Sequence, residues 1–557
     1  MKENKYGIYV SKKRITPVEF KSDRKGYPDK DLVDSIVGMT NAEGGDLYLG
    51  IEDDSTVTGI QPYHADESGV KAMIQNRTVP PLYVDAQLIQ EQGLQVLDLK
   101  IPQSTTLTST SEGKYLIRRL KVDGTPETVG MTPAELDSRR SDLRLLDYSG
   151  RILEISASEV LDYPLIQKLR TLIRERQGDY SLLELDDEQL LHALHITTAR
   201  NGKDYPTVAG LLLIGKAEWI RKLIPSAESA FQVIEGLAVR KNDHSFDALI
   251  STVERFEELF NAWNPETEVM EGMFRRPIPE FSFQAFREGL VNAFCHRDYT
   301  RLQPVRVLID DEGLTICSPG GFLPGITLED LLTAEPKSRN PLLTDIMKRI
   351  GLAERTGRGI DRIYEGSIVY GRPLPDYSES NSQQVKLYIP RAKPNITFTQ
   401  MLSDEITRTG KTFSINALLV WSYLEQERRL TLTELSSLIH IGQARTRTAV
   451  ENLVESGLVE GHGSGKNRDY TLSQSLYKID DKSAEYERQK INIQKSLSDT
   501  ILDYLSTRAS ASKTQLSEVT GYSSQTIYKA LKELQQQGRI TAVGKARSTR
   551  YKLADHF

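Results

Sequence analysis

One pattern occurs twice in the C-terminal part of the chain and limits what that part can fold into. Each copy has an apolar helix, a short second helix, a turn, a longer third helix and two short strands joined by a glycine-containing basic segment. The first copy extends from Ala417 to Leu472 and the second from Ile501 to Leu553. This repetition predicts two small domains of the same kind in tandem.

The element order of each copy is typical of a winged helix-turn-helix, whose third helix lies in the major groove and whose wing contacts the DNA backbone. We therefore predict that double-stranded DNA is a partner, because polar and basic side chains suit base edges and phosphates. The alternative, that these modules bind proteins, stays open. The candidate DNA-binding residues are Gln443, Arg445, Arg447, Lys466, Arg468, Ser524, Gln525, Tyr528, Lys529, Lys532, Lys545, Arg547 and Arg550.

The rest of the chain predicts further domains. Its 557 residues suffice for several domains at roughly 150 residues each. We predict a multidomain protein that combines α/β and α+β parts. The expected divisions are an α/β domain at 1–142, a helical and α/β connecting region at 143–276, an α/β sandwich at 277–392, winged helices at 410–475 and 496–557, and a charged linker at 476–495.

Apolar spacing predicts individual elements within these divisions. Helices are expected at 32–39 and 283–294, and strands at 305–309 and 314–318. The continuous apolar run Val208–Ile214 predicts a buried strand. The segment Gly210–Ala217 nearly fits a P-loop, but it ends in alanine instead of serine or threonine and its interior is expected to be a strand. A P-loop helicase motor is therefore not expected.

Composition favours a cytoplasmic protein with no membrane partner. No apolar run approaches the ~20 residues of a membrane span, and the polar start Met1–Lys5 is not followed by the apolar core of a secretion signal. The two cysteines, Cys295 and Cys317, cannot form a disulfide framework and lack metal-ligand spacing. The net charge of −6 does not exclude DNA binding, which depends on local basic patches. Homo-oligomer formation stays open.

The segment Arg287–Tyr299 is the most informative part of the central region. Glu288, Asn292 and His296 are spaced by four residues and so share one face of a helix. A carboxylate and an amide one turn apart can hold hydrated Mg²⁺ beside triphosphate oxygens. Glycines in the segment 351–360 precede another helix, where backbone N–H groups can approach phosphate. These features predict a nucleotide site; the alternative is that the side chains only brace neighbouring loops.

Four segments resemble the ATP-binding domain of GHKL (Bergerat-fold) ATPases, and more closely that of bacterial proteins described as RecG-like helicases or transcriptional regulators. They are 288–299, 318–321, 339–343 and 351–360. The resemblance implies that ATP and Mg²⁺ are cofactors, with Glu288 activating the attacking water and Asn292 ligating the metal. The candidate nucleotide-binding residues are Asn292, His296, Asp298, Gly320, Gly321, Gly357, Arg358 and Gly359.

One departure from the GHKL pattern affects the expected activity. That family holds adenine with an Asp-x-Gly-x-Gly element, whereas the corresponding segment here, Ser318-Pro319-Gly320-Gly321, has no aspartate. Adenine specificity and ATP hydrolysis are therefore both left open, and the enzyme expectation is limited to a weak ATPase.

The N-terminal region resembles the Schlafen AlbA_2 domain over residues 8–130. The elements Val18–Lys21, Asn41–Gly45 and Gly50–Asp54 occur in order. In nuclease-active Schlafen relatives, three carboxylates bind a divalent metal that activates water. The resemblance assigns two of these places to Glu19 and to either Glu52 or Asp53, with Lys21 as charge stabiliser. The third place falls at Arg14, whose positive charge would repel a metal and argues against cleavage.

These observations support three hypotheses. The first is a nucleotide-binding, DNA-binding transcriptional regulator, in which the nucleotide favours one domain arrangement. The second is a Schlafen-type metal-dependent nuclease effector in phage defence. The third is an assembly protein whose winged helices bind other proteins.

Overall fold

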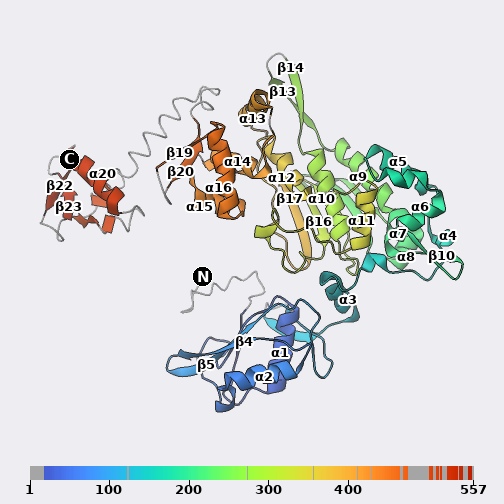
Figure 1. Ribbon diagram of the computed structural model, residues 1–557, viewed down its shortest axis with the longest axis horizontal. Helices are drawn as coiled ribbons and strands as arrows, with labels where there is room; N and C mark the ends of the chain where they lie inside the picture. Colours follow the sequence, from blue (N-terminus) through green and yellow to red (C-terminus); the bar gives the residue numbers. More distant parts are fainter. Residues whose placement is uncertain are drawn as a thin grey trace. The chain divides into compact units, whose positions relative to one another are not determined.

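The computed structural model describes residues 18–554 except 122–124, 272–273, 355–356, 411, 428, 464–467, 474–500, 503, 506–509, 514, 517–523, 537 and 544–549. The chain divides into two compact units, Met1–Pro394 and Asn395–Phe557, which are described separately (Figure 1). Within the described residues, none of the helices combines the length and apolar character that a membrane crossing requires. The expected linker at 476–495 lies outside the described residues.

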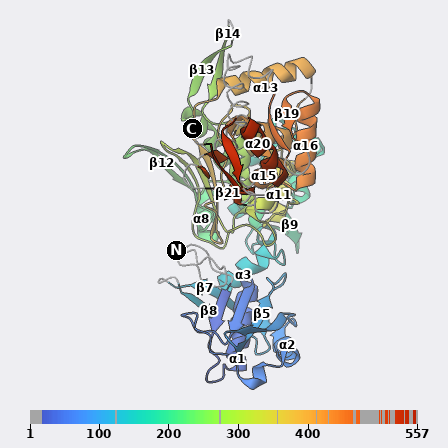
Figure 2. The ribbon, with the colours of Figure 1, turned by 90° about the vertical axis from the view of Figure 1, so that its left-hand side faces the viewer.

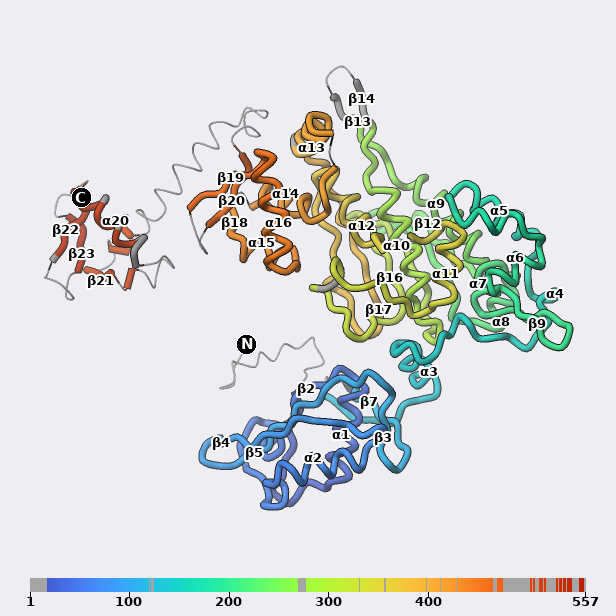
Figure 3. The backbone as a smooth tube through the Cα atoms, viewed as in Figure 1, coloured from blue at the N-terminus to red at the C-terminus, as the bar shows by residue number. Residues whose placement is uncertain are grey.

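The N-terminal domain is a four-stranded sheet whose apolar residues pack against two helices (Figure 3). The strand order is β1-β2-β5-β4, in which only β1 and β2 are parallel. Residues Leu32, Ile36 and Met39 of the first helix are fully buried in this core, which confirms the predicted helix at 32–39. The elements are β1 (Val18–Lys21), α1 (Asp29–Asn41), β2 (Gly45–Leu49), α2 (Glu67–Asn76), β4 (Asp85–Glu91) and β5 (Leu94–Ile101).

The motif Asn41–Gly45 anchors the end of α1. The buried Asn41 amide nitrogen donates hydrogen bonds to the carbonyls of Thr108 and Leu116, at 2.7 and 2.9 Å, and its oxygen accepts one from the Thr108 N–H. Gly44 has φ +75°, and a Cβ there would lie 2.6 Å from the Ile101 carbonyl oxygen. The motif therefore ties α1 to two short two-stranded sheets, β3–β6 (Thr78–Val79, Ser109–Thr110) and β7–β8 (Leu116–Leu120, Pro126–Gly130).

The region after this domain is mainly helical. The predicted strand Val208–Ile214 is wrong, because this segment is the helix α7. The Thr207 hydroxyl accepts a hydrogen bond from the Gly210 N–H and caps the helix, and all seven helical residues are buried, so the sequence shows no amphipathic period. The elements are α3 (Pro133–Asp142), α4 (Ala157–Val160), α5 (Leu165–Glu175), α6 (Asp187–Ala193), β9 (Thr197–Arg200), β10 (Lys203–Pro206), α7 (Val208–Ile214) and α8 (Ala217–Leu223).

A five-stranded sheet forms the centre of the first unit, in the order β12-β11-β15-β16-β17. Its strands β11 and β12 come from the region 143–276, which was predicted to be a connecting region. The expected strands at 305–309 and 314–318 and the expected helix at 283–294 are confirmed. The elements are β11 (Ser229–Glu235), β12 (Ala238–Ser245), α9 (Leu249–Ala262), α10 (Phe283–His296), β15 (Val305–Ile309), β16 (Gly313–Pro319), α11 (Pro341–Arg349), α12 (Gly359–Ile368) and β17 (Gln384–Pro390).

This sheet shares one apolar core with the helices around it and with the helical region before it. Phe260 of α9 stacks on Phe286 of α10, with ring centroids 4.0 Å apart. A two-stranded hairpin, β13–β14 (Glu266–Glu271, Phe274–Pro279), projects from the body of this domain (Figures 1 and 2). The core gives α10 a fixed position on the sheet, and α10 carries the candidate nucleotide residues.

The C-terminal unit contains two small bundles, each with a three-stranded sheet. In the first, Trp421 of α14 is fully buried between Phe398 and Phe413. The first bundle comprises α13 (Ile396–Thr409), α14 (Ile415–Glu427), β18 (Leu430–Thr431), α15 (Leu432–Ile439), α16 (Gln443–Glu455), β19 (Val459–His462) and β20 (Asp469–Leu472). The described elements of the second include β21 (Ala511–Ser512), α20 (Ser524–Gln536), β22 (Ile540–Val543) and β23 (Arg550–Leu553). The order of these elements agrees with the repeated pattern in the sequence.

Candidate functional site: a cavity between α10, α12 and the central sheet

The central domain encloses a cavity of ≈ 240 Å³. It is bounded by α10, the strands β16 and β17, the segment 321–339 and the start of α12. Five predicted nucleotide residues line it, namely Asn292, His296, Gly321, Gly357 and Gly359. Four other predicted residues are not part of its lining, namely Glu288, Asp298, Gly320 and Arg358.

The start of α12 lies directly against α10. A Cβ on Gly359 would be 3.1 Å from Glu288 Oε2 and 3.5 Å from Asn292 Nδ2. Glycine at this position therefore leaves room for both side chains next to the first turn of α12. Because the first N–H groups of a helix have no partner within the helix, this turn offers hydrogen-bond donors to an anion.

Glu288 is buried beside the cavity and pairs with a cation. Its Oε1 accepts a hydrogen bond from Arg362 Nη1 at 3.2 Å, and Arg362 also forms an ion pair with Glu354. Burial raises the pKa of the Glu288 carboxyl above its usual range, although Arg362 acts in the opposite direction. A carboxylate with a raised pKa accepts a proton more readily near neutral pH.

His296 lies at the end of α10 and is held neutral. Burial and the positive charges of Arg339 and Lys348 lower the pKa of its imidazole to about 4. Lys337, Arg339 and Lys348 all line the cavity. Lys337 and Lys348 were not predicted as site residues, because neither stands in a recognisable motif.

The buried pair Arg339 and Asn340 caps α10. Arg339 donates from Nη1 to the His296 carbonyl at 2.8 Å and from Nη2 to the Gly321 carbonyl at 3.0 Å. Asn340 Nδ2 donates to the carbonyls of Cys295 and Arg297, at 3.1 and 2.8 Å. These carbonyls have no partner within the helix. The Arg-Asn-Pro segment thus positions the end of α10 and one loop of the cavity.

Asp298, a predicted nucleotide residue, instead connects α10 with α3. Its carboxylate accepts hydrogen bonds from the Ser138 hydroxyl at 2.5 Å and from the Thr300 N–H at 3.0 Å. Burial raises the pKa of Asp298, but these hydrogen bonds outweigh burial and lower it overall. The same helix α3 supplies Asp142, whose Oδ1 lies 2.6 Å from Arg339 Nη2. A wall of the cavity is thereby tied to α3.

In the N-terminal domain, Glu19 faces two cations. Its carboxylate oxygens lie 2.8 Å from Lys21 Nζ and 3.1 Å from Arg118 Nε. Glu52 accepts hydrogen bonds from the hydroxyls of Ser22 and Thr58. Within the described residues, no group of three potential metal-ligand atoms contains Glu19, Glu52 or Asp53. Arg118 was not predicted as a partner of Glu19, because it lies far from Glu19 along the chain. Arg14 is outside the described residues.

Some candidate DNA-binding side chains are exposed in the C-terminal unit. Gln443, Arg445 and Arg447 lie on the solvent side of α16, and Tyr528 and Lys532 are exposed on α20. Arg468 packs over the ring of Tyr470, and Arg550 donates to the Ser510 hydroxyl at 3.0 Å. Lys466, Lys545 and Arg547, with the side chains of Ser524, Gln525 and Lys529, lie outside the described part of the chain.

Three family models match parts of the chain. Residues 16–123 match the Schlafen AlbA_2 domain, residues 303–389 match the family described as "Putative ATP-dependent DNA helicase recG C-terminal", and residues 139–229 match a domain of unknown function. The chain therefore combines a Schlafen AlbA_2 domain with an ATPase-type domain of the RecG-like family. No curated protein matches the chain.

Two solved structures are similar to parts of the chain. The DIP2311 protein from Corynebacterium diphtheriae is 21% identical with a TM-score of 0.50, over 84% of this chain and 94% of that chain. This similarity supports the fold. The N-terminal domain of a "Putative ATP-dependent DNA Helicase RecG-related Protein" from Nitrosomonas europaea is 18% identical, over 16% of this chain and 66% of that chain, with a TM-score of 0.14.

The lowered pKa of His296 predicts a pH dependence of stability. An unfolded chain protonates this imidazole near pH 6.5, whereas the folded chain does so near pH 4. The unfolded state therefore binds more protons between these values, and the contribution of His296 to stability falls as pH drops through this window, by at most about 1.4 kcal/mol per unit. Urea unfolding at stepped pH should show a shallower decline for His296→Gln than for the wild type. An equal change in the control His244→Gln, an exposed histidine, would contradict this assignment.

The ion pairs of Glu19 predict a structural role. Replacing it by glutamine removes the negative charge that lies beside Lys21 and the buried Arg118, so we expect Glu19→Gln to lower the free energy of unfolding by about 3 kcal/mol. The control is Glu127→Gln, which breaks the exposed pair of Glu127 with Arg119 and should cost less than about 1 kcal/mol. Chemical denaturation measures both. Equal losses in the two variants would show that Glu19 is not held in this way.

Proposed function

We propose that this protein is a transcriptional regulator that binds ATP with Mg²⁺ in the central cavity and double-stranded DNA with its C-terminal modules. The observation that carries the proposal is the lining of the cavity. Asn292 lies against the glycine-rich start of α12, with three cationic side chains around the same space. The match of residues 303–389 to an ATPase-type family supports the same conclusion.

The lining suits the two parts of a nucleotide. Lys337, Arg339 and Lys348 provide positive charge for a triphosphate, and the first N–H groups of α12 provide donors. The Asn292 amide oxygen would serve as a ligand of Mg²⁺, which usually keeps several of its waters. Apolar side chains offer a surface for a base, and they include Ile316, Phe322, Leu323, Val385 and Leu387.

Hydrolysis would be weak in this site. Glu288 has the raised pKa of a general base, but its carboxylate is engaged by Arg362. A base must be free to accept a proton from water, and this ion pair opposes that role. We therefore propose that the binding of ATP in the cavity, more than its hydrolysis, regulates the protein.

The contacts of α3 provide a route for that regulation. A ligand shifts an equilibrium only by its different affinities for two states. Arg339 lines the cavity and also binds Asp142 of α3, while Arg139 of α3 donates to the Ser104 carbonyl of the N-terminal domain at 3.1 Å. A nucleotide that draws Arg339 toward its phosphates would compete with Asp142 for this guanidinium.

The exposed cations of the C-terminal bundles support DNA binding. Arg445 and Arg447 project from α16, which corresponds to the third helix of the first predicted winged helix-turn-helix, the helix with which such modules contact DNA. Two modules in one chain increase affinity because binding of the first raises the effective concentration of the second.

The alternative function, a Schlafen-type nuclease effector in phage defence, requires carboxylates around a metal. Two cations occupy that position beside Glu19. We therefore propose that the N-terminal domain contributes binding contacts and does not cleave nucleic acid.

Thermal unfolding with ATP and Mg²⁺ tests the nucleotide site. Ligand at about 100 times its Kd stabilises the folded state by about 2.7 kcal/mol, so the Tm of the wild type should rise. Without ATP, Asn292→Ala should have the same Tm as the wild type. With ATP and Mg²⁺, its Tm should not rise. Asn242→Ala, at an exposed asparagine of β12 outside the cavity, is the matched control and should keep it. A wild type with the same Tm with and without ATP would refute the proposal.

Salt dependence tests the DNA interface. Fluorescence anisotropy with a labelled duplex should show binding that weakens steeply between about 50 and 300 mM salt. The double variant Arg445→Ala/Arg447→Ala should bind more weakly and reduce the salt slope by about 2, if each arginine contacts one phosphate. Arg408→Ala is the control, because Arg408 is already paired with Glu405. Binding that does not change with salt would contradict a DNA interface.

A further inference from the structure

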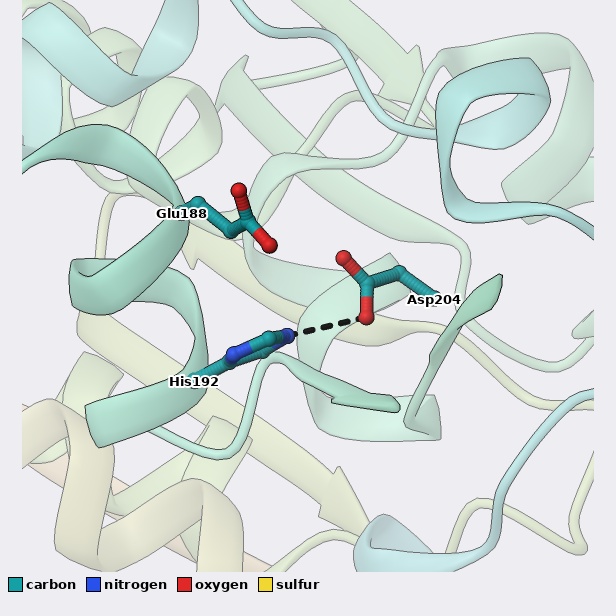
Figure 4. A group of neighbouring side chains, drawn as sticks. All are labelled: Glu188, His192 and Asp204. Carbon is teal, nitrogen blue, oxygen red and sulfur yellow. Dashed lines mark hydrogen bonds and ion pairs between the residues drawn. The ribbon is translucent and has the colours of Figure 1, made fainter. Parts of the chain in front are cut away.

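Outside the cavity, two carboxylates and one imidazole converge from different elements. Glu188 and His192 lie one turn apart on α6, and Asp204 lies on β10. Their potential ligand atoms are all within 4.8 Å of one another, and His192 Nε2 is 2.9 Å from Asp204 Oδ1. Figure 4 shows the three side chains pointing toward one another.

Two local structures position the three residues: the helix α6 carries Glu188 and His192, and the hairpin β9–β10 carries Asp204. On one side, a capping box of Asp186 and Gln189 starts α6, so Glu188 and His192 project from the same helical face. On the other side, Asp204 is paired with Ala199 in the hairpin β9–β10. The turn of this hairpin has positive φ at Asn201 and Gly202, which closes it tightly.

The two carboxylates of this group have no lysine or arginine partner among the residues that the structure describes. Within the described residues, neither Glu188 nor Asp204 forms an ion pair with a lysine or arginine, while the adjacent Arg170 pairs with Asp187. Two unit charges at this separation repel each other by about 1 kcal/mol even in water. The same negative charges act on the nearby Tyr163: burial, Asp204 and Glu188 raise the pKa of its phenol.

We propose that Glu188, His192 and Asp204 form a binding site for a divalent transition metal ion of the Zn²⁺ type. One imidazole nitrogen and two carboxylate oxygens are a donor set that Zn²⁺ accepts, at about 2.0 to 2.2 Å from each donor. Mg²⁺ and Ca²⁺ prefer sites made of oxygen atoms only. Glu188 already points toward the other two side chains and completes the set, and water would take the remaining positions.

Such an ion would connect α6 with the hairpin β9–β10, inside the segment that matches a domain of unknown function. It would turn the repulsion between the two carboxylates into attraction to a shared cation. The site is separate from the nucleotide cavity, whose lining contains none of the three residues.

Isothermal titration of the full chain with Zn²⁺, without nucleotide, tests this site. Wild type should bind one equivalent that His192→Ala and Asp204→Asn each weaken by more than tenfold. His244→Ala is the matched control: His244 also pairs with a carboxylate, Glu228, but within the described residues it belongs to no group of three His, Cys, Asp or Glu ligand atoms, so this variant should keep the equivalent. Mg²⁺ in place of Zn²⁺ should bind far more weakly.

Two measurements show whether a variant loses Zn²⁺ binding because the ligand is removed or because the fold is disturbed. Circular dichroism and Tm without metal should be the same for the variants and the wild type. Added Zn²⁺ should raise the Tm of the wild type and of His244→Ala only. The proposal is overturned if His192→Ala binds Zn²⁺ as wild type does, or if His244→Ala loses the same equivalent.

Discussion

The hydrogen bonds that Arg339 and Asn340 donate to the end of α10 hold the central site together. The final carbonyls of a helix have no partner within it, and here they are buried, where an unpaired carbonyl costs about 1 to 3 kcal/mol. Arg339 and Asn340 satisfy the carbonyls of Cys295, His296 and Arg297, and Arg339 also holds the Gly321 loop and Asp142. The same guanidinium therefore fixes a helix, a loop of the cavity and a contact with α3.

Two of the carboxylates that were assigned catalytic chemistry, Glu288 in the ATPase part and Glu52 in the AlbA_2 part, differ because their surroundings differ. Glu288 lies in the protein interior, where burial raises the pKa of its carboxyl despite the ion pair with Arg362. Glu52 is only partly buried, and hydrogen bonds from Ser22 and Thr58 lower the pKa of its carboxyl. Carboxylates of the same chemical type thus acquire opposite tendencies to hold a proton, and neither tendency is visible in the motif that contains the residue.

Sequence patterns predicted most elements where the apolar period was clear. The helix at 283–294 and the strands at 305–309 and 314–318 are present within a residue or two. The run Val208–Ile214 was misread because it is buried on every side, so that helix and strand have the same apolar pattern. For the cavity, spacing along one helix indicated Asn292 and His296, but Lys337 and Lys348 come from segments whose sequence contains no signal of their position.

The sequence by itself determined the order of domains, the repeated C-terminal pattern, and the face shared by Glu288, Asn292 and His296, because these depend on residue order and helical geometry. Only the tertiary structure decided which charges meet. It placed Arg118 against Glu19, Asp142 against Arg339, and Asp204 beside Glu188 and His192. These partners are distant or lie on different elements, and the energy of a charge depends on burial and on neighbours that the folded chain alone brings within a few ångströms.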